Sequence, residues 1–408
     1  MTLMTAVSDV LAALPDLRPR QEELYVHLHQ HPELSSHETK TAALIADRLG
    51  ALGYEVIPVG GGVVGVLRNG DGPTVLMRAD IDGLPVSEQT GLPYASTDTA
   101  TDDDGHTVGL MHACGHDVHI TSLLSAAELL AGTRAPWQGT FIALFQPAEE
   151  TAAGAQAMLD AGLTGLIPRP DVALGQHVLG YEAGRIGIKA GPALSCADSI
   201  RITLFGAGTH GSMPQLGVDP IVLAASVVQR LQGIVARELT PGERAVVTVG
   251  ALNAGTKSNI IPDRATLLVN TRVYSDDVRA KVLGAIERIV KAECEASDSP
   301  KPPTFEYYDQ FPLTNNDAAT TEKVRAAFVD HFGDRVFTMD AIAASEDFSR
   351  VPDAFGTPYT YWGLGGFPAG AKAAPNHSPF FAPVQQPTLS AGTEAVVVAV
   401  LAYLSKDA

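Results

Sequence analysis

The sequence predicts a two-domain α/β protein, in which a layered α/β domain is interrupted by a smaller, inserted α+β domain. Three observations predict this organisation. The chain has 408 residues, whereas a single hydrophobic core stops growing at about 250–300 residues. Strand and helix patterns alternate in the N-terminal part and return near the C-terminus, as in layered α/β domains. Between these parts the elements follow the order β-α-β-β-α-β, which is that of a ferredoxin-like unit.

The N-terminal part contains apolar runs with helical or strand periodicity, separated by Gly, Asn, Asp and Pro. Ser35 and Glu38 have the spacing of a capping box ahead of the second helix. Gly53 can close that helix, and the tract over residues 69–72 predicts a turn between two strands. We expect helices over 20–30, 39–52, 120–130 and 154–161, and strands over 55–59, 63–67, 74–79, 140–145 and 172–176.

The middle of the chain is flanked on both sides by glycine and proline residues of the kind found in hinges between domains. Gly191-Pro192 precedes it, and a Pro-rich tract over residues 299–303 follows it. We therefore place the inserted domain at 192–304, and the two parts of the discontinuous domain at 1–191 and 305–408. A last helix is expected over 388–405. Inside the insertion we expect strands over 199–205, 245–252, 264–273 and 304–308, and helices over 219–237 and 276–296.

Composition excludes several classes of protein. The formal charge of −18, from 28 basic and 46 acidic residues, disfavours a nucleic-acid binder or a partner of anionic membranes. The N-terminus has no basic region of a signal peptide, and the longest apolar run, residues 395–404, is shorter than the ~18 residues of a membrane span. Three widely spaced cysteines give no disulfide framework, so we expect a cytoplasmic protein.

Metal-ligating residue types are concentrated between Met111 and His119, which includes three histidines, a cysteine and an aspartate. If this stretch is extended, Cys114 and His116 point to one side, because strand side chains alternate. A thiolate and an imidazole on one face suit zinc or a similar ion. The alternative is a buried cysteine beside polar loop residues, and for a lone Cys-x-His that alternative would prevail.

Three further places complete a candidate ligand set. Glu149 and Glu150 follow an apolar strand, so one carboxylate can ligate a metal while the other acts as a general base towards water. The alternative is a solvated pair that opens a helix. His177 lies at a predicted strand end, where sites of α/β sheets assemble, and His377 lies in a Pro-flanked loop. Taken singly, each histidine would be structural.

Several long motifs, in order along nearly the whole chain, resemble the aminoacylase/hippurate hydrolase family of metal-dependent amidohydrolases, which is related to glutamate carboxypeptidase. Within that family the sequence is most similar to bacterial N-acyl-amino-acid aminoacylases, including those that cleave acyl-glutamine conjugates. The motifs are HQHPELS at 29–35, RADIDGLP at 78–85, HACGHD at 112–117, QPAEE at 146–150, GAGTHG at 206–211, NIIPD at 259–263, NTR at 270–272 and SEDFS at 345–349.

The resemblance implies a fold and a metal site. It implies a catalytic domain with a zinc-peptidase-like mixed sheet, and an inserted domain for dimerisation and lid closure. One or two divalent ions would be bound, with Cys114 as a bridge if there are two. Zinc is expected, with manganese or cobalt as alternatives. The implied metal ligands are Cys114, His116, Glu150, His177 and His377.

The resemblance also implies the catalytic and substrate-binding residues. Glu149 would be the general base, and His210 of a partner subunit would stabilise the oxyanion in a homodimer. Asn259 and Arg272 would recognise the substrate's carboxylate or amide. Asp80 and Asp117 would orient the metal ligands from behind, as such sites require.

Other positions depart from the family pattern or have no clear role. Gln215 stands where many relatives have a second histidine, and Asn270 and Ala344 stand where relatives often have glycine. These changes affect the substrate pocket. We interpret His112 and His119 as structural, and the chemistry of Glu346 and Asp347 assigns them no role.

The expected activity is metal-dependent hydrolysis of the amide bond of small N-acyl-L-amino acids, with no nucleic-acid or membrane partner. A metallo-dipeptidase or carboxypeptidase is the rival within the same class, and free-amine substrates would separate the two. The rival from another class is a catalytically silent metal-binding homologue. Glu149 beside a full ligand set disfavours it, because a silent protein has no need of the base.

Overall fold

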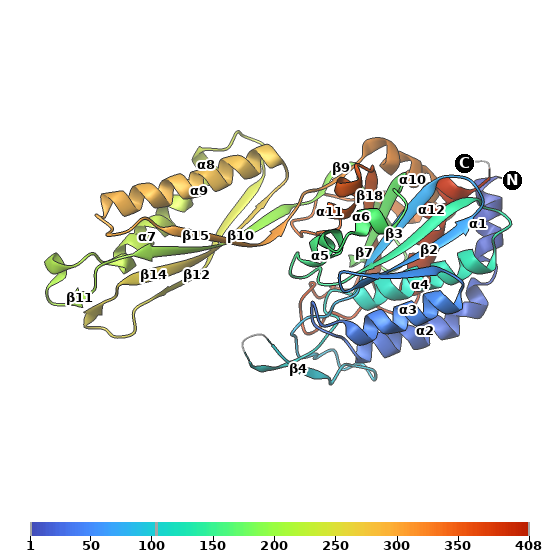
Figure 1. The fold of residues 1–408 in the computed structure, drawn as a ribbon, viewed down its shortest axis with the longest axis horizontal. Helices are drawn as coiled ribbons and strands as arrows, with labels where there is room; N and C mark the ends of the chain where they lie inside the picture. Colours follow the sequence, from blue (N-terminus) through green and yellow to red (C-terminus); the bar gives the residue numbers. More distant parts are fainter. Residues whose placement is uncertain (1, 103–104, 407–408) are drawn as a thin grey trace. The chain divides into compact units, whose positions relative to one another are not determined.

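A computed structural model describes residues 2–102 and 105–406 and divides the chain into two compact units (Figure 1). The large unit comprises Met1–Ala193, Asn315–Asp340 and Asp347–Ala408, and the small unit comprises Leu194–Thr314 and Ala341–Glu346. The small unit extends beyond residue 304 because the strand β15 (Thr304–Phe311) pairs with a strand of that unit over Thr304–Tyr308 and again at Phe311.

The large unit is built on an eight-stranded mixed sheet, in the order β1-β2-β6-β3-β7-β18-β8-β17. Its central strands β6, β3, β7 and β18 run parallel, and the sheet is almost wholly buried there. Near-continuous apolar runs in these strands fit a sheet that is covered on both faces. The strands span β1 Glu55–Val59, β2 Gly62–Asn69, β3 Thr74–Asp80, β6 Gly139–Gln146, β7 Val172–Glu182, β8 Ile186–Ile188, β17 Val336–Thr338 and β18 Tyr359–Phe367.

Helices cover this sheet and carry most of the large core. α4 and α12 pack on each other and on the central strands, and α12 is buried on nearly every side, as a helix that is apolar all round must be. α1 and α2 cover these two helices, which places them in an outer layer (Figure 1). The helices are α1 Leu3–Leu11, α2 Leu14–Gln30, α3 Thr39–Ala51, α4 His116–Gly132, α5 Gly154–Asp160, α6 Leu163–Leu166, α10 Ala318–Phe332, α11 Arg350–Phe355 and α12 Thr388–Leu404, with a 3₁₀ turn η2 at Gly333–Arg335.

The small unit is a four-stranded antiparallel sheet in the order β12-β14-β10-β15, with helices on one face. This strand order and the β-α-β-β-α-β sequence are those of the predicted ferredoxin-like unit. Alternate residues of β14 pack into a separate apolar core under the helices. The elements are β10 Cys196–Phe205, η1 Pro214–Leu216, α7 Pro220–Leu231, α8 Gly233–Arg237, β12 Ala245–Ala254, β14 Arg264–Val273, α9 Asp276–Ala296 and β15.

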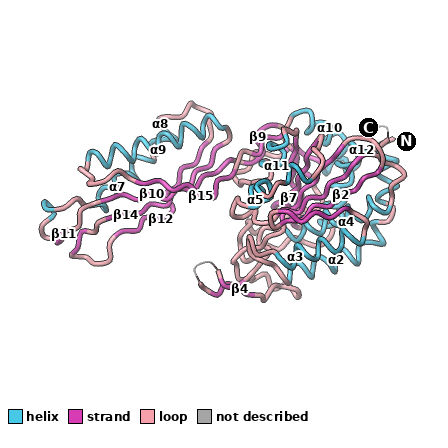
Figure 2. The backbone as a smooth tube through the Cα atoms, in the orientation of Figure 1, coloured by secondary structure: helices cyan, strands magenta, loops and turns pink. Residues whose placement is uncertain are grey.

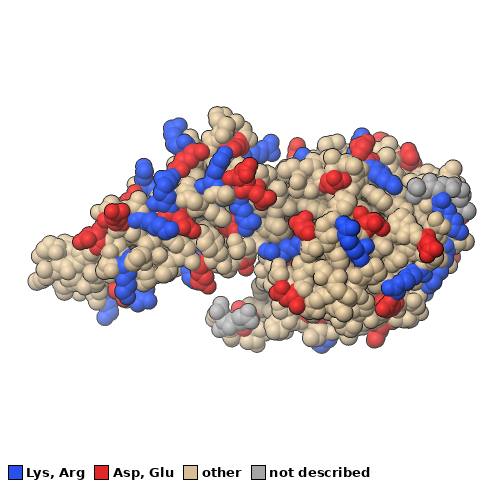
Figure 3. All heavy atoms as spheres, turned by 45° about the horizontal axis from the view of Figure 1, so that its top comes forward, with Lys and Arg blue, Asp and Glu red and all other residues tan. Residues whose placement is uncertain are grey.

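Short strand pairs complete the chain, and Figure 2 shows them as small magenta segments among loops. β4 (Thr99–Thr101) pairs with β5 (Thr107–Gly109) in an arm of the large unit, and β11 (Thr209–His210) pairs with β13 (Ile260–Ile261) at one end of the small unit. β9 (Gly191–Leu194) pairs with β16 (Thr314–Asn316), where the chain passes between units. On the face shown in Figure 3, acidic and basic side chains are intermixed.

One local prediction is wrong. α3 begins at Thr39 as expected, but Ser35 and Glu38 form no capping box, and the N-cap Glu38 makes no side-chain cap bond. The Ser35 hydroxyl instead donates to Asp82 (2.7 Å), and a Glu38 carboxylate oxygen accepts from the amide of Ala148 (2.7 Å). Both residues therefore brace loops from other parts of the large unit.

Candidate metal centre and active site

The candidate site lies at one edge of the large sheet, where parallel strands end. Asp80 is the last residue of β3, and Glu149 and Glu150 follow shortly after the end of β6. His177 lies in β7, which continues to Glu182 and does not end at residue 176 as predicted. Because β3 runs parallel to both neighbours, these polar residues meet at the same edge, where ligands bind in open α/β sheets.

The run from Met111 to His119 is not extended, so the alternation of strand side chains does not explain how Cys114 and His116 meet. Gly115 has a φ of +79°, and α4 begins at the next residue, His116. A Cβ atom on Gly115 would lie 2.2 Å from a side-chain carbon of Val178, so this turn requires glycine. The turn still brings Cys114 and His116 to one point, together with His177.

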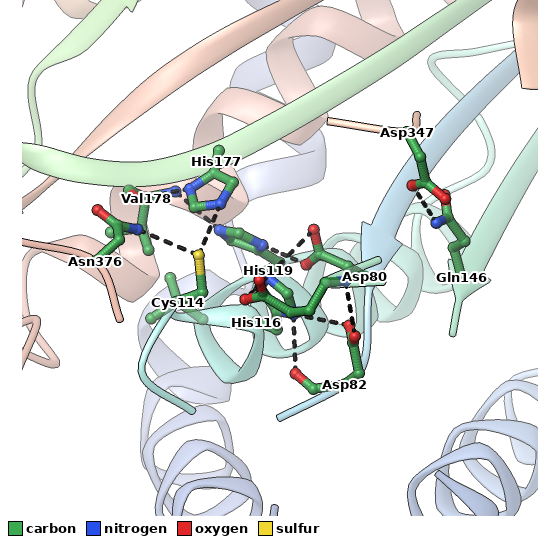
Figure 4. A network of polar contacts seen from close by, with 12 residues as sticks. Asp80, Asp82, Cys114, His116, His119, Gln146, His177, Val178, Asp347 and Asn376 are labelled. Atoms are coloured by element: carbon green, nitrogen blue, oxygen red, sulfur yellow. Dashed lines mark hydrogen bonds and ion pairs between the residues drawn. The ribbon is translucent and has the colours of Figure 1, made fainter. Parts of the chain in front are cut away.

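The five predicted metal ligands form one cluster. Candidate ligand atoms lie within 4.8 Å of one another in the sets Cys114–His116–His177 and Cys114–Glu150–His377. The Cys114 sulfur is 3.4 Å from Nε2 of His177, and Nε2 of His377 is 3.2 Å from Oε2 of Glu150. Figure 4 shows the sulfur between His177 and the amide nitrogen of Asn376, which lies 3.3 Å away. Cys114 thus belongs to both sets.

Two buried polar atoms in this cluster lack a hydrogen-bond partner among the described residues. They are Nε2 of His116 and Oε1 of Glu150, and they lie 3.8 Å apart. Leaving a buried polar atom unpaired is costly, and a cation between a neutral imidazole nitrogen and a carboxylate oxygen would satisfy both. Thiolate, imidazole and carboxylate are the ligand types that zinc takes. The residues present therefore fit a divalent metal ion.

The electrostatics favour positive charge at two of the candidate ligands, His377 and His116. Hydrogen bonds to Cys114 and to Glu150 raise the pKa of His377 to about 10. Burial lowers the pKa of His116, but the charge of Asp80 and the bond to Asp82 outweigh burial, so that the net pKa is well above the usual value. The potential around these two residues is therefore negative, and a divalent cation can replace their protons. Burial lowers the pKa of His177 well below its usual value, which favours the neutral ring that a metal ligand needs.

Asp82 fixes His116, and sequence reasoning gave it no role. Nδ1 of His116 donates to the backbone oxygen of Asp82 (2.9 Å) and lies 3.1 Å from its Oδ1, which leaves Nε2 directed into the cluster (Figure 4). The other oxygen of Asp82 accepts from the amide of Glu150 (3.0 Å). One buried carboxylate thus positions two candidate ligands, as metal sites require. The sequence signal that could have identified Asp82 is its position two residues after Asp80 in the same motif.

Asp80 and His119 form a second support. Nδ1 of His119 donates to Oδ1 of Asp80 (2.6 Å), and the amide of Val178 donates to Nε2 of the same ring (2.8 Å). Both nitrogens of His119 are therefore engaged, and it orients Asp80, which fits its interpretation as a structural residue. Oδ2 of Asp80 lies 3.7 Å from Nε2 of His116, so Asp80 itself borders the ligand cluster.

Arg78 links Asp80 to Asp347, a residue from the C-terminal part of the large unit. Its guanidinium is buried and donates to Oδ2 of Asp80 (2.6 Å), to Gln146 (2.9 Å) and to Asp347 (3.3 Å). Gln146 also donates to Asp347 (2.5 Å), whose other oxygen accepts from the amide of Ala155 (3.1 Å). Asp347, to which the sequence assigned no role, therefore closes a buried network behind the site (Figure 4).

The loop that carries Glu149 and Glu150 is closely packed. Ala148 has a φ of +46°, and a Cβ atom on Gly154 would lie 1.5 Å from the backbone oxygen of Pro147. This packing buries the Glu149 side chain, whose carboxylate lies within 4.8 Å of the ligand atoms of His116 and Glu150. Glu149 is therefore placed beside the cluster, while Glu150 takes part in it.

Asp117, the second residue of α4, links the start of this helix to His29. Its Oδ2 accepts from Nδ1 of His29 (2.7 Å), and its Oδ1 accepts from the amide of Val118 (2.8 Å). Nε2 of His29 lies 3.2 Å from a carboxylate oxygen of Glu88, and all three side chains are buried. His29 bonds to two carboxylates, so it carries a proton on each nitrogen. Its position in the HQHPELS motif was the only signal for it.

The three predicted residues of the small unit fall into two groups. His210 and Asn259 are neighbours beside the β11–β13 pair, where the amide of Gly211 donates to the backbone oxygen of Asn259 (2.8 Å). His210 is exposed, and its Nδ1 lies 2.7 Å from the Ser212 hydroxyl. Arg272 lies near the opposite end of β14, away from this pair.

No helix among the described residues is both long enough and apolar enough to cross a membrane.

Comparison with known proteins identifies relatives over most of the chain. Residues 76–402 match the family model described as peptidase family M20/M25/M40. The chain is 33% identical over 350 residues to an N-acetyl-L-cysteine deacetylase of Bacillus subtilis, with 83% of this chain and 79% of that protein covered. It is 36% identical over 346 residues to a hippurate hydrolase of Campylobacter jejuni, with 83% and 87% covered.

A solved structure shares the fold. A Bacillus subtilis protein, described as a dinuclear metal-binding peptidase from the M20 family, superposes with a TM-score of 0.77 at 28% identity. The superposition covers 95% of this chain and 98% of that one.

Proposed function

Because the chain belongs to peptidase family M20/M25/M40, we propose that it is a metal-dependent amidohydrolase that splits small N-acyl-L-amino acids into a carboxylic acid and a free amino acid. The observation that carries the proposal is the cluster of Cys114, His116, Glu150, His177 and His377 with the buried carboxylate of Glu149 beside it. The deacetylase and the hippurate hydrolase named above act on acyl-amino acids, which supports the same substrate class here.

The five clustered residues would hold one or two divalent metal ions, with Cys114 shared between them if two are bound. Zinc suits the mixed sulfur, nitrogen and oxygen ligands best, with manganese or cobalt as alternatives. Such an ion supplies a Lewis acid for the scissile carbonyl and makes water acidic enough to react near neutral pH. Asp80, Asp82 and Asp117 would keep the ligands in place.

Glu149 is proposed as the general base. Its side chain is buried next to the ligand cluster, so it can take a proton from the attacking water and return it to the leaving amine. Glu150 cannot serve equally well, because its carboxylate already faces His377 and Cys114.

We also propose a homodimer in which His210 and Asn259 of one subunit complete the site of the other. Two features of the small unit support an interface. β12 is an edge strand with unpaired backbone groups, and most of the large apolar side chains that are exposed among the described residues belong to this unit. They are Met213, Leu216, Ile221, Val222, Val235, Val246, Leu252 and Ile260.

In this proposal, Arg272 comes from the same subunit as the metal ligands, and it binds the carboxylate of the substrate. The separation of Arg272 from His210 and Asn259 along the small sheet supports a site assembled from two subunits. A cytoplasmic location fits the three free, buried cysteines, since thiols stay reduced there.

The test is amine release from a panel of acetyl, benzoyl and longer acyl groups on Gln, Gly and Met, beside unblocked dipeptides. Each reaction is run with added zinc or manganese and with a chelator. Metal-dependent release from acyl-amino acids, without cleavage of dipeptides, is the expected result. Cleavage of dipeptides alone would favour a peptidase, and metal binding without any hydrolysis would favour a silent homologue.

A further inference from the structure

The sheet of the small unit has one face covered by helices and one open face. In β14, Leu267, Val269 and Val273 pack into the apolar core under the helices. Because side chains alternate along a strand, Asn270 and Arg272 both lie on the open face, where they are partly exposed. Polar residues two apart on one face of a strand are close enough to bond.

Arg272 is a half-buried cation without an acidic partner among the described residues. Within the described part of the chain, its guanidinium makes hydrogen bonds to two neutral acceptors, the side-chain oxygen of Asn270 and the hydroxyl of Ser345. Burial lowers the pKa of Arg272, although the guanidinium stays charged at any physiological pH. A partly desolvated guanidinium with no carboxylate beside it can bind an anion from solution.

The Asn270 carboxamide can be oriented in only one way. Arginine has no acceptor, so the atom that faces Nε of Arg272 at 3.1 Å must be the amide oxygen. The amide nitrogen of Asn270 then donates to the hydroxyl of Ser199 on the neighbouring strand (3.2 Å), which faces Asn270 in the register of β10 and β14. The side chain is thus anchored at one end and accepts from arginine at the other.

Two nitrogens of the Arg272 guanidinium, Nε and Nη1, donate hydrogen bonds that fix its orientation. Nε–H points to Asn270, and one hydrogen of Nη1 points to Ser345 at 2.6 Å, whose hydroxyl is itself 3.1 Å from that of Ser195. No other acceptor in residues 2–102 and 105–406 bonds to Nη2 or to the second hydrogen of Nη1, so these donors are available to an anion. They form the end of the fork, which matches the two oxygens of a carboxylate.

We propose that Asn270 is a positioning residue that holds Arg272 so that the free end of its guanidinium meets the α-carboxylate of the substrate. The inference rests on the proposed function and adds to it a residue that determines preference for a free carboxylate. A long side chain that is fixed before binding loses less entropy on binding. Without the carboxamide, Arg272 must be ordered by the substrate, which weakens binding by roughly 3- to 10-fold.

The experiment compares Asn270→Ala and Asn270→Asp with wild-type holoenzyme on an N-acetyl-amino acid and on the corresponding amino-acid amide, which has no carboxylate. Thr248→Ala is the matched control, because Thr248 faces Asn270 from β12 and makes no side-chain bond to Arg272. Asn270→Ala should raise KM for the acid by roughly 3- to 10-fold with kcat unchanged. Thr248→Ala should match wild type.

Asn270→Asp separates positioning from packing. The aspartate has nearly the same shape and still accepts from Nε, but its charge neutralises Arg272 and repels the substrate anion. KM for the acid should therefore rise at least about tenfold, whereas kinetics on the amide should not change in either variant. Wild-type KM in Asn270→Asp, or equal losses on acid and amide, would overturn the proposal.

A binding measurement keeps this inference separate from the proposed function. If wild-type enzyme hydrolyses no acyl-amino acid, the proposed function fails, but calorimetric titration with N-acetylmethionine still tests Asn270. Weaker binding in Asn270→Ala and still weaker binding in Asn270→Asp would support the positioning role. Equal affinity in all three proteins would reject it.

Discussion

Nε2 of His116 lies 3.8 Å from Oε1 of Glu150, and neither of these buried atoms has a hydrogen-bond partner among the described residues. The orientation of the His116 ring is fixed, because its other nitrogen, Nδ1, bonds to Asp82. An imidazole that is held so firmly, with its second nitrogen aimed at an unpaired carboxylate oxygen, is arranged around a cation.

Metal removal is the direct test of this arrangement. Chelation should abolish hydrolysis and lower the unfolding temperature, because the two unpaired atoms and the other ligands lose the ion that stabilises them. Differential scanning calorimetry with and without chelator, followed by zinc or manganese re-addition, measures both effects. An unfolding temperature that does not respond to metal would contradict a site of this strength.

The two adjacent glutamates should separate in function. Glu149→Gln should keep its metal content, as measured by mass spectrometry, while kcat falls by about 100- to 10,000-fold through loss of the proposed general base. Glu150→Gln should lose metal, because its carboxylate faces His377 and Cys114. The reverse pattern would mean that the two roles are exchanged.

His210→Ala should lower kcat by about 100- to 1000-fold, since it removes the donor that we propose for the oxyanion. If the residue acts across a dimer, mixing His210→Ala with Glu149→Gln should restore activity, because half of each hybrid's sites are intact. Random exchange of subunits predicts about a quarter of wild-type activity. Each inactive variant alone is the control, and a fully active monomer on gel filtration would exclude action in trans.

Stability should fall at alkaline pH through His29. Burial opposes its charge, but hydrogen bonds to Asp117 and Glu88 outweigh burial and raise its pKa to about 10. Its folded pKa exceeds the unfolded value of about 6.5, so this stabilisation is full below that value and disappears as the pH rises through 10. We expect a loss on the order of 3–5 kcal/mol.

Urea denaturation of metal-free wild type and His29→Gln from pH 6 to pH 10.5 checks this expectation. The variant should be less stable at pH 6, and the difference from wild type should narrow as the pH rises. A constant difference across this range would mean that His29 contributes by packing alone.

The buried network behind the site should be intolerant of single deletions. Asp347→Ala removes one carboxylate partner from the Arg78 guanidinium and removes acceptors from Gln146 and Ala155. Breaking a buried ion pair in this way costs about 3–5 kcal/mol. Denaturant unfolding of Asp347→Ala measures this cost, and Glu322→Ala, which removes an exposed ion pair with Arg325, is a control expected to change stability by less than about 1 kcal/mol.

Local signals predicted elements well where neighbouring residues decide them. β14 and α9 have the expected bounds, because β14 alternates strictly and the Ser275 side chain caps α9 ahead of two aspartates. The capping-box prediction failed because Ser35 has a partner from another part of the chain, and tertiary hydrogen bonds outweigh local spacing.

The candidate site shows the same division. Its residue types and their motifs could be recognised from the sequence, but their supports could not. Asp347 meets Arg78 across most of the chain, and the double clamp on His29 comes from two separate segments. At Gly115, the close approach of the Val178 side chain leaves no room for a Cβ atom, and no local pattern encodes this contact.

The position of β18 in the large sheet constrains how the chain is made. β18 lies between β7 and β8, although roughly 180 residues separate it from β7 along the chain. At about 5–20 residues per second, the edge of β7 that pairs with β18 waits roughly 10–40 seconds on the ribosome for its partner. The small unit, whose strands are nearly contiguous, can close its sheet during that interval. The nascent large unit therefore exposes this edge of β7 during that interval, and the candidate ligand set is complete only after His377 has been synthesised.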